Sequence, residues 1–125
     1  MIHKLGQVML YIENLDKGKK FWTEKLNFTV LKDNMDDHGM RSIEIKPNKE
    51  GSSIVLIDKQ FVAEMEPEIN LETPSLMFFA EDLEALYSEM SEKNVTLGKL
   101  VVMPSGEKVF NFADDEENYF AVMEK

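Results

Sequence analysis

The clearest structural pattern in the chain lies in residues 7–33, QVMLYIENLDKGKKFWTEKLNFTVLKD. It begins with a mostly apolar run ending at Ile12 and continues into a segment whose apolar residues recur at helical spacing. Asn14 is a suitable N-cap for that helix, and Asn27 stands where helices often end in left-handed geometry. The apolar face of the predicted helix consists of Leu15, Gly18, Trp22 and Leu26. The stretch therefore predicts a strand, a helix and the start of a second strand.

The same pattern returns in the second half of the chain. Asp82, which is 68 positions after Asn14, is the predicted N-cap of a second helix, and Asn94 follows that helix. Its apolar face consists of Leu83, Leu86, Tyr87 and Met90. The shift of 68 positions also maps Gln7 to Ser75, and it maps Ser53 to Ala121 without a gap. An internal repeat of pattern, rather than of sequence identity, is therefore predicted.

Short strands separated by Gly, Asn, Asp and Pro residues complete each half. The predicted strands are residues 5–12, 28–32, 40–46, 53–58, 75–80, 95–103, 107–113 and 119–123. Each half then has the order strand, helix and three strands. We predict an α+β fold with two tandem βαβββ modules in one domain, residues 1–125. Module 1 covers about residues 1–58, a polar and acidic connector covers 59–73, and module 2 covers about 74–125.

Composition limits the classes of function. The chain has 24 Asp and Glu residues against 14 Lys and Arg residues, which gives a net charge of −10. Nucleic-acid binding is not expected, because a phosphate backbone repels such a chain. There is no cysteine, which excludes disulfides and thiolate chemistry. No apolar run approaches the roughly 20 residues of a membrane span, and the start has no signal-peptide pattern, so we expect no membrane partner and a cytoplasmic location.

Three stretches carry a resemblance to a known family. They are residues 7–33, quoted above, MRSIEIKP in the middle, and DDEENYFAVME near the end. The chain resembles the vicinal oxygen chelate superfamily, the group of glyoxalases, bleomycin resistance proteins and extradiol dioxygenases. In the closing turn, Asp115 and Glu117 stand where that family usually has Pro and Gly. The resemblance implies two modules whose curved mixed sheets form a cup, and often a homodimer. It does not specify a reaction, since this fold hosts many chemistries.

The resemblance also implies where a divalent metal ion would bind. Many members hold one at the floor of the cup, with ligands from the first and last strands of each module. Those positions correspond here to Gln7, Ser53, Ser75 and Ala121. One amide, two hydroxyls and a methyl group form a poor donor set compared with His and carboxylate ligands. We therefore expect no metal site and no cofactor, with a divalent metal ion as the alternative.

Strand alternation predicts which side chains line the cup, if Gln7 points into it. The predicted ligand-binding residues are Gln7, Met9, Tyr11, Arg41, Val55, Ser75, Met77, Phe79, Tyr119, Ala121 and Met123. Such a lining suits a small, partly apolar ligand. The alternative is that these side chains fill the cup or pack in a dimer interface. Arg41, the only arginine, could bind a ligand carboxylate or phosphate, or form a surface salt bridge.

Several other polar residues have a simpler structural interpretation. His3 is expected in the N-terminal segment exposed to solvent, and His38 in an acidic turn with Asp36 and Asp37. Glu44 is interpreted as a surface residue of a strand. No catalytic residue can be assigned from these patterns.

The functional hypothesis is metal-independent binding of a small organic molecule, as in sequestration or resistance, by a homodimer. The alternative is an enzyme, either a glyoxalase-like lyase or isomerase or a dioxygenase that uses a divalent metal. A dimeric interaction module without a ligand is a third possibility.

Overall fold

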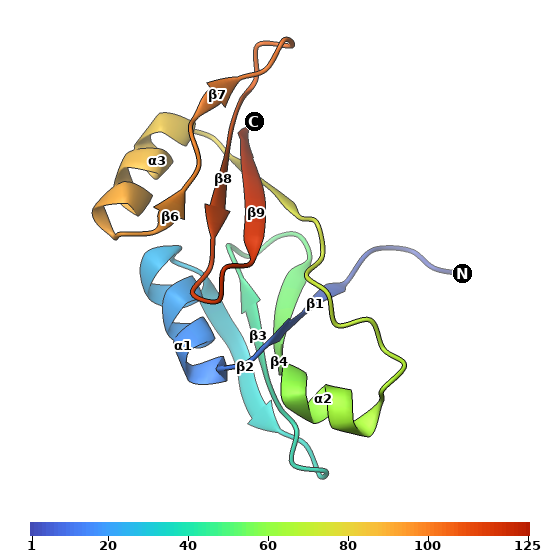
Figure 1. Ribbon diagram of the computed structural model, residues 1–125. Helices are drawn as coiled ribbons and strands as arrows, with labels where there is room; N and C mark the ends of the chain where they lie inside the picture. The colour runs from blue at the N-terminus through green and yellow to red at the C-terminus, as the bar shows by residue number, and fades with distance from the viewer. The chain divides into compact units, whose positions relative to one another are not determined.

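The computed structural model describes all 125 residues, and they divide into two compact units, Met1–Thr73 and Pro74–Lys125. Each unit contains one sheet of parallel and antiparallel strands and at least one helix, so the expected α+β class is confirmed (Figure 1). The two units are described separately below.

Unit 1 contains a four-stranded sheet in the order β1-β4-β3-β2. Its elements are β1 (Gln7–Ile12), α1 (Leu15–Lys20), the π-helical turn η1 (Phe21–Lys25), β2 (Thr29–Met35), β3 (Arg41–Lys46), β4 (Ser53–Asp58) and α2 (Lys59–Met65). Strands β1 and β4 run parallel, whereas the β3 pairs are antiparallel. The predicted βαβββ order is present, but α2 lies in the connector where no helix was predicted.

Unit 2 repeats this arrangement with the order β5-β9-β8-β6, and β7 also pairs with β8. Its elements are β5 (Met77–Ala80), α3 (Leu83–Glu92), β6 (Thr96–Leu97), β7 (Val101–Val102), β8 (Lys108–Ala113) and β9 (Tyr119–Glu124). The single strand predicted over residues 95–103 is wrong, because two short strands flank an interruption. Gly98 lies in that interruption, and its N–H donates to the Asn111 carbonyl at 2.8 Å.

The helix ends are where the sequence predicts them. The Asn14 side chain accepts a hydrogen bond from the Lys17 N–H at 3.0 Å, and Asp82 accepts one from the Ala85 N–H at 3.1 Å. Asn27 and Asn94 adopt left-handed backbone geometry, with φ of 59° and 62°. Asn tolerates this geometry better than most residues, and in each unit the helical segment ends two residues before its asparagine, η1 at Lys25 and α3 at Glu92.

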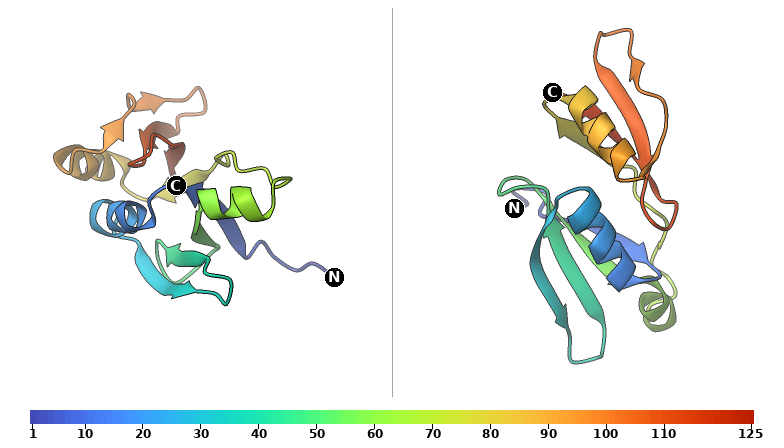
Figure 2. Two further views of the ribbon diagram at one scale, coloured as in Figure 1. Left: turned by 60° about the horizontal axis from the view of Figure 1, so that its bottom comes forward. Right: turned by 90° about the vertical axis from the view of Figure 1, so that its left-hand side faces the viewer.

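One face of each sheet packs against a helix (Figure 2). In unit 1, Leu10 and Ile12 on β1 are buried, as is Trp22, and Gly18 lets α1 approach so closely that a Cβ would overlap the Ile12 side chain. In unit 2, Leu83 and Met90 of α3 are buried. The sheet strands contribute the buried side chains of Phe110, Phe112, Phe120 and Val122. Both helix-covered faces are thus apolar cores.

The strand pairings correct the ungapped repeat. In unit 1, Gln7 lies opposite Ser53, but in unit 2 it is Met77, not Ser75, that lies opposite Ala121. The segment from the first strand to its parallel partner is therefore two residues shorter in unit 2 than in unit 1. With Gln7 still matched to Ser75, Ser53 corresponds to Tyr119 and not to Ala121. Because side chains alternate with a period of two, this shift leaves the predicted facing of each residue unchanged.

Candidate functional site

A pocket of about 340 Å³ lies within unit 1, on the side of the sheet opposite to α1. Its walls come from β1, β4, α2 and the turn between β2 and β3. The lining residues are Met9, Tyr11, Asp36, His38, Met40, Ile57, Phe61, Val62, Met65, Glu66 and Ile69. Two of the predicted ligand-binding residues, Met9 and Tyr11, therefore line this pocket. Its volume lies in the range of small-molecule sites.

Helix α2 forms the wall of the pocket that the sequence interpretation missed. Asp58 caps this helix by accepting a hydrogen bond from the Phe61 N–H at 3.2 Å. Val62 is buried in a cluster with Val55 and Ile57, and Tyr11 packs against that cluster. Val55, a predicted ligand-binding residue, thus lies beneath α2. The capping aspartate and the apolar spacing within residues 59–65 were the available signals, but the many acidic neighbours indicated a connector.

The turn between β2 and β3 forms another edge of the pocket. The Asp36 carboxylate accepts hydrogen bonds from the N–H groups of His38, at 2.8 Å, and Met40, at 2.9 Å. These backbone donors, that of Met40 foremost, lower the pKa of Asp36, so the carboxylate stays ionised. Gly39 has a φ of 86°, which glycine adopts without steric cost. The turn was predicted, but its place beside the pocket was not.

A polar group occupies the other end of the same sheet face. Glu44 on β3 accepts hydrogen bonds from the Ser53 hydroxyl, at 2.5 Å, and from the Gln7 amide, at 3.0 Å. These two donors lower the pKa of Glu44 and hold it as a carboxylate. An open depression of about 710 Å³ lies beside this polar group, with Lys4 and Lys46 also in its lining. The interpretation of Glu44 as a surface residue missed this connection.

The donors at this end do not fit the metal site that the resemblance implies. Glu44 is the sole carboxylate within the hydrogen-bonded group, and it is already engaged by Gln7 and Ser53. No group of three or more His, Cys, Asp or Glu side chains in the chain could hold a metal ion. At the paired positions Met77 and Ala121 of unit 2, neither the thioether nor the methyl group offers a strong ligand for a divalent cation.

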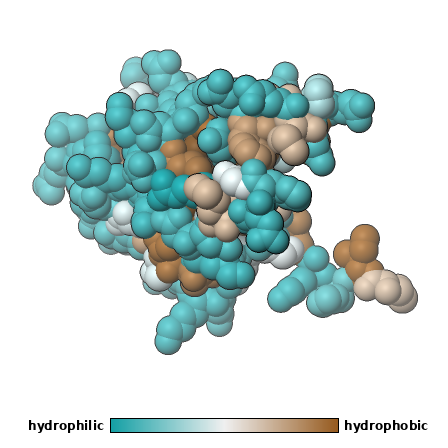
Figure 3. All heavy atoms as spheres, turned by 90° about the horizontal axis from the view of Figure 1, so that it is seen from below, coloured by the Kyte–Doolittle hydropathy of each residue, from teal (hydrophilic) through white to brown (hydrophobic).

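The sheet face of unit 2 that is not covered by α3 carries most of the remaining predicted residues. Phe79 is 64% exposed, Tyr119 60% and Met77 47%, while Ala121 and Met123 on the same face are partly buried. The Lys125 ammonium lies 5.5 Å from the centre of the Phe79 ring. These side chains are brought together by the β5–β9 register. On the face of the molecule drawn in Figure 3, most of the surface is hydrophilic, with smaller hydrophobic areas exposed between the polar ones.

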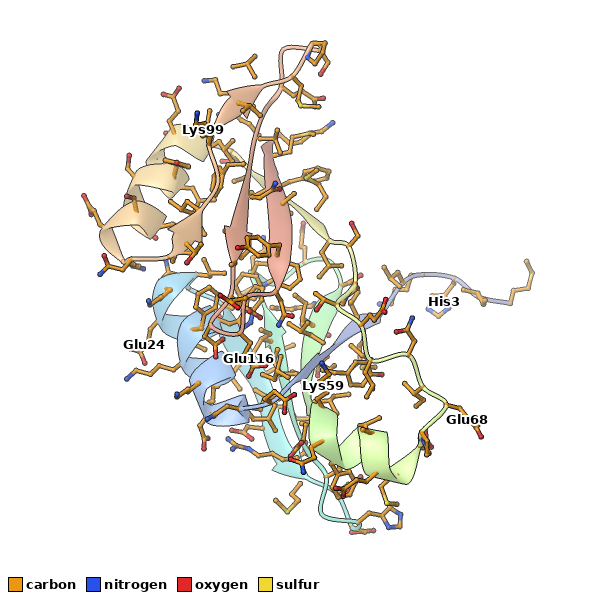
Figure 4. The ribbon with its side chains drawn as sticks, in the orientation of Figure 1. His3, Glu24, Lys59, Glu68, Lys99 and Glu116 are labelled. Carbon is orange, nitrogen blue, oxygen red and sulfur yellow. The ribbon has the colours of Figure 1, made fainter.

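Three other residues from the sequence interpretation lie away from the pocket. Ser75 is exposed and precedes β5 instead of lying in it. Arg41 binds Asp33 with two nitrogens, at 3.0 and 3.1 Å, and Asp16 with a third, at 2.7 Å. Of its two predicted roles, the salt bridge is the one observed. His3 lies in the exposed segment before β1, apart from the strands (Figure 4).

The ion pairs of Arg41 also fix the protonation of their partner. The guanidinium of Arg41, together with the Lys19 ammonium 2.8 Å away, lowers the pKa of Asp33 to about 2. The same contacts, first of all with Asp33 and then with Asp16, raise the pKa of Arg41. This network ties β2 and β3 to α1 on unit 1.

Glu124 on β9 has a structural role as well. Its side chain accepts a hydrogen bond from the Leu83 N–H at 3.1 Å, which satisfies a free donor in the first turn of α3. The closing turn before β9 is likewise held by a buried carboxylate, Asp114, which accepts from the N–H groups of Glu116 and Asn118, both at 2.9 Å. Glu116 itself lies in this turn between β8 and β9 (Figure 4).

Helices that could span a membrane are absent, since none has the necessary length and apolar character.

Comparison with known proteins agrees with this architecture. "Uncharacterized protein YetH" of Bacillus subtilis (strain 168) is 30% identical over 125 residues, which cover 99% of this chain and 100% of that protein. A member of the glyoxalase/bleomycin resistance protein/dioxygenase superfamily from Sphaerobacter thermophilus DSM 20745 has a similar structure. The TM-score is 0.85 at 21% identity, over 99% of this chain and 98% of that chain.

A second solved structure is that of TnmS3, an antibiotic binding protein from Streptomyces sp. CB03234. It is similar with a TM-score of 0.82 and 20% identity, over 98% of this chain and 96% of that chain. At these identities the structural likeness shows the fold. The sequence profile of the Glyoxalase/Bleomycin resistance protein/Dioxygenase superfamily matches residues 4–122. Since this match spans nearly the whole chain, the protein belongs to the Glyoxalase/Bleomycin resistance protein/Dioxygenase superfamily.

Proposed function

We propose that the protein binds a small, partly apolar organic molecule in the pocket of unit 1, without a metal ion, and acts by sequestration. The observation that carries this proposal is the pocket of about 340 Å³, whose walls combine Met9 and Tyr11 of β1 with Phe61 and Met65 of α2. Aromatic rings and thioethers supply contact area to a flat apolar ligand, while the Tyr11 hydroxyl offers a hydrogen bond.

Binding by itself requires no catalytic group, which agrees with the chemistry of the site. Glu44 is the carboxylate nearest to the family's metal-ligand positions, and its lowered pKa makes it a poor general base near neutral pH. Gln7 and Ser53 both donate to it and are thereby engaged. The likeness in fold to an antibiotic binding protein supports the same class of function.

We also propose that the protein is a homodimer. The exposed sheet face of unit 2 is proposed as a surface through which the two copies contact each other. Support comes from Met77, Phe79 and Tyr119, which together expose large apolar side chains on one face of a short sheet. Exposed apolar patches of this kind commonly mark interaction sites. Analytical ultracentrifugation of the wild type and of Phe79→Ser measures the assembly state; a monomeric wild type would contradict the dimer.

The binding proposal is tested with a small-molecule library screened by thermal shift on the wild-type protein. Compounds that stabilise it are then measured by calorimetry on Met9→Ala and Phe61→Ala. We expect affinity to fall about tenfold in each variant, because each loses a wall of the pocket. Met35→Ala is the matched control, since Met35 is 63% exposed on β2 and does not line the pocket.

Two outcomes would contradict the proposal. Unchanged affinities in both pocket variants would place binding elsewhere. Tight stoichiometric binding of Ni²⁺, Zn²⁺, Mn²⁺ or Fe²⁺ by the wild type would favour the alternative of a metal-dependent lyase, isomerase or dioxygenase.

A further inference from the structure

The pocket of unit 1 has acidic side chains in its lining and no lysine or arginine. Its ionisable lining residues, apart from His38 and Tyr11, are the carboxylic acids Asp36 and Glu66. The two carboxylates come from different elements, one from the turn after β2 and the other from the end of α2. An apolar cavity with acidic groups from two elements distinguishes among ligands by their charge.

The arginine nearest in sequence does not offset these carboxylates. Arg41 follows Met40, which lines the pocket, yet its guanidinium is bound by Asp33 and Asp16. A bidentate ion pair of this kind fixes the guanidinium in one place. An anionic ligand would therefore meet two carboxylates in the pocket and no available arginine.

Asp36 is also held in place. Its carboxylate accepts the N–H groups of His38 and Met40, which fix the side chain to the turn. A fixed anion needs little reorganisation when a cation arrives, so more of the attraction appears as affinity. Glu66 ends α2, where its backbone N–H donates to the Val62 carbonyl at 2.8 Å.

The apolar walls favour the same charge. Tyr11 and Phe61 contribute aromatic rings to the lining, and the face of an aromatic ring attracts cations. The whole chain carries a net charge of −10, which raises the local concentration of cations over that of anions.

We propose that the ligand of this pocket is a cationic apolar molecule, a flat hydrophobic body carrying a protonated amine or a quaternary ammonium group. This inference rests on the proposed binding function and names the chemical class of its ligand. The apolar body contacts Phe61, Met65 and Met9, while the positive group lies toward Asp36 and Glu66.

Three probes of matched shape test the inference by calorimetry at pH 7.5. They are (naphthalen-2-yl)methyl-trimethylammonium, its neutral tert-butyl isostere and naphthalene-2-acetate. We expect the cation to bind about tenfold more tightly than the neutral isostere, from two partly screened ion contacts and a cation–π contact. The anion is expected to bind more weakly than the neutral probe. Raising the salt concentration should reduce the advantage of the cation.

Two variants assign the effect to the named carboxylates. Asp36→Asn removes the charge of the side chain and keeps an oxygen acceptor for the N–H groups of the turn. Glu66→Gln removes the charge of the side chain that follows α2. Each should weaken binding of the cation about threefold and leave the neutral probe unchanged. Asp37→Asn and Glu64→Gln are matched controls, because they remove one charge from the same turn and the same helix without touching the pocket lining.

The outcomes separate this inference from the function on which it rests. If the neutral probe binds as tightly as the cation, and Phe61→Ala weakens both, the pocket binds apolar molecules and the charge inference is overturned. Equal losses in the control and pocket variants would also overturn it, since they reflect net charge alone. If no probe binds and Phe61→Ala alters no hit of the library screen, the proposed function itself fails.

Discussion

The two units share a helix-covered sheet face and differ on the opposite face. In unit 1 that opposite face is partly covered by α2, which buries Val55 and Ile57, and it carries the hydrogen-bonded group of Gln7, Glu44 and Ser53. In unit 2 the corresponding face is left with Phe79 and other large side chains exposed. The helix-covered faces must be apolar for either unit to fold, whereas the opposite faces are free to diverge and to acquire binding properties.

We expect the largest change in stability from a substitution beneath α2 in unit 1, compared with one on the exposed sheet face of unit 2. Val62→Ala removes a buried side chain from beneath α2 and should lower the free energy of unfolding by about 1–3 kcal/mol. Phe79→Ala removes a larger side chain that is 64% exposed in the single chain, and the expected loss, measured at a protein concentration low enough to keep the chain monomeric, is below about 0.5 kcal/mol. Urea denaturation followed by circular dichroism measures both. Equal losses would mean that the face of unit 2 is as well packed as that of unit 1.

A pair of engineered histidines tests the difference between the polar ends. Gln7→His with Ser53→His places two imidazoles beside the Glu44 carboxylate, whereas Met77→His with Ala121→His places them beside Asn111. We expect Zn²⁺ to bind the first double variant about tenfold more tightly, because a carboxylate is a better ligand than an amide. Calorimetric titration measures this ratio. Equal affinities would show that Glu44 cannot turn toward the two positions.

The ion pairs of Asp33 in unit 1 should make the free energy of unfolding depend on pH in the acid range. The pKa of Asp33 is lowered to about 2, below its unfolded value, so its contribution is present above about pH 4 and is lost as the pH falls through 2. Asp33→Asn should cost about 1 kcal/mol at pH 7, because solvent screens these partly exposed charges. Below pH 4 the unfolding free energy of the variant should fall less steeply than that of the wild type.

The control for this network is a simple pair in unit 2. Glu84→Gln removes the partner of Lys108, 3.3 Å away, and both side chains are exposed enough for solvent to weaken the pair. Its effect should be close to zero at pH 7. If Glu84→Gln lowered the free energy of unfolding more than Asp33→Asn does, the exposed pair of unit 2 would be the stronger one and the prediction would be wrong.

A small gain in stability, rather than a loss, is expected in the turns that precede β4 and β9. Gly51, two residues before Ser53, has a φ of 83°, and Glu117, two residues before Tyr119, has a φ of 63°. Both units thus need a left-handed residue at this place, but unit 2 has a side chain there. Glu117→Gly should raise the free energy of unfolding by about 0.5 kcal/mol, since relief of strain exceeds the added entropy of the unfolded chain. A lower melting temperature in calorimetry would contradict this.

The features that local patterns encode were predictable. Asn14 and Asp82 cap their helices, because a side-chain oxygen one residue before a helix satisfies its free N–H groups. Alternation assigned Leu10 and Ile12 to the helix-covered face and Met9 to the other. Helix α2 was not predicted, since its four apolar residues are too few to stand out among acidic neighbours.

Local sequence patterns were enough to predict the repeated βαβββ order, the helix ends and which side chains share a face, because caps, left-handed asparagines and periods of 2 and 3.6 are local properties. Which of those faces forms a pocket depends on long-range packing. Only the folding of α2 onto β1 and β4 brings Phe61 and Tyr11 into the lining of one pocket, and only the pairing of β3 with β4 brings Glu44 to Ser53. The tertiary structure also showed that Arg41 is held by Asp33 and Asp16, since partners 8 and 25 residues away are set by packing and not by local spacing.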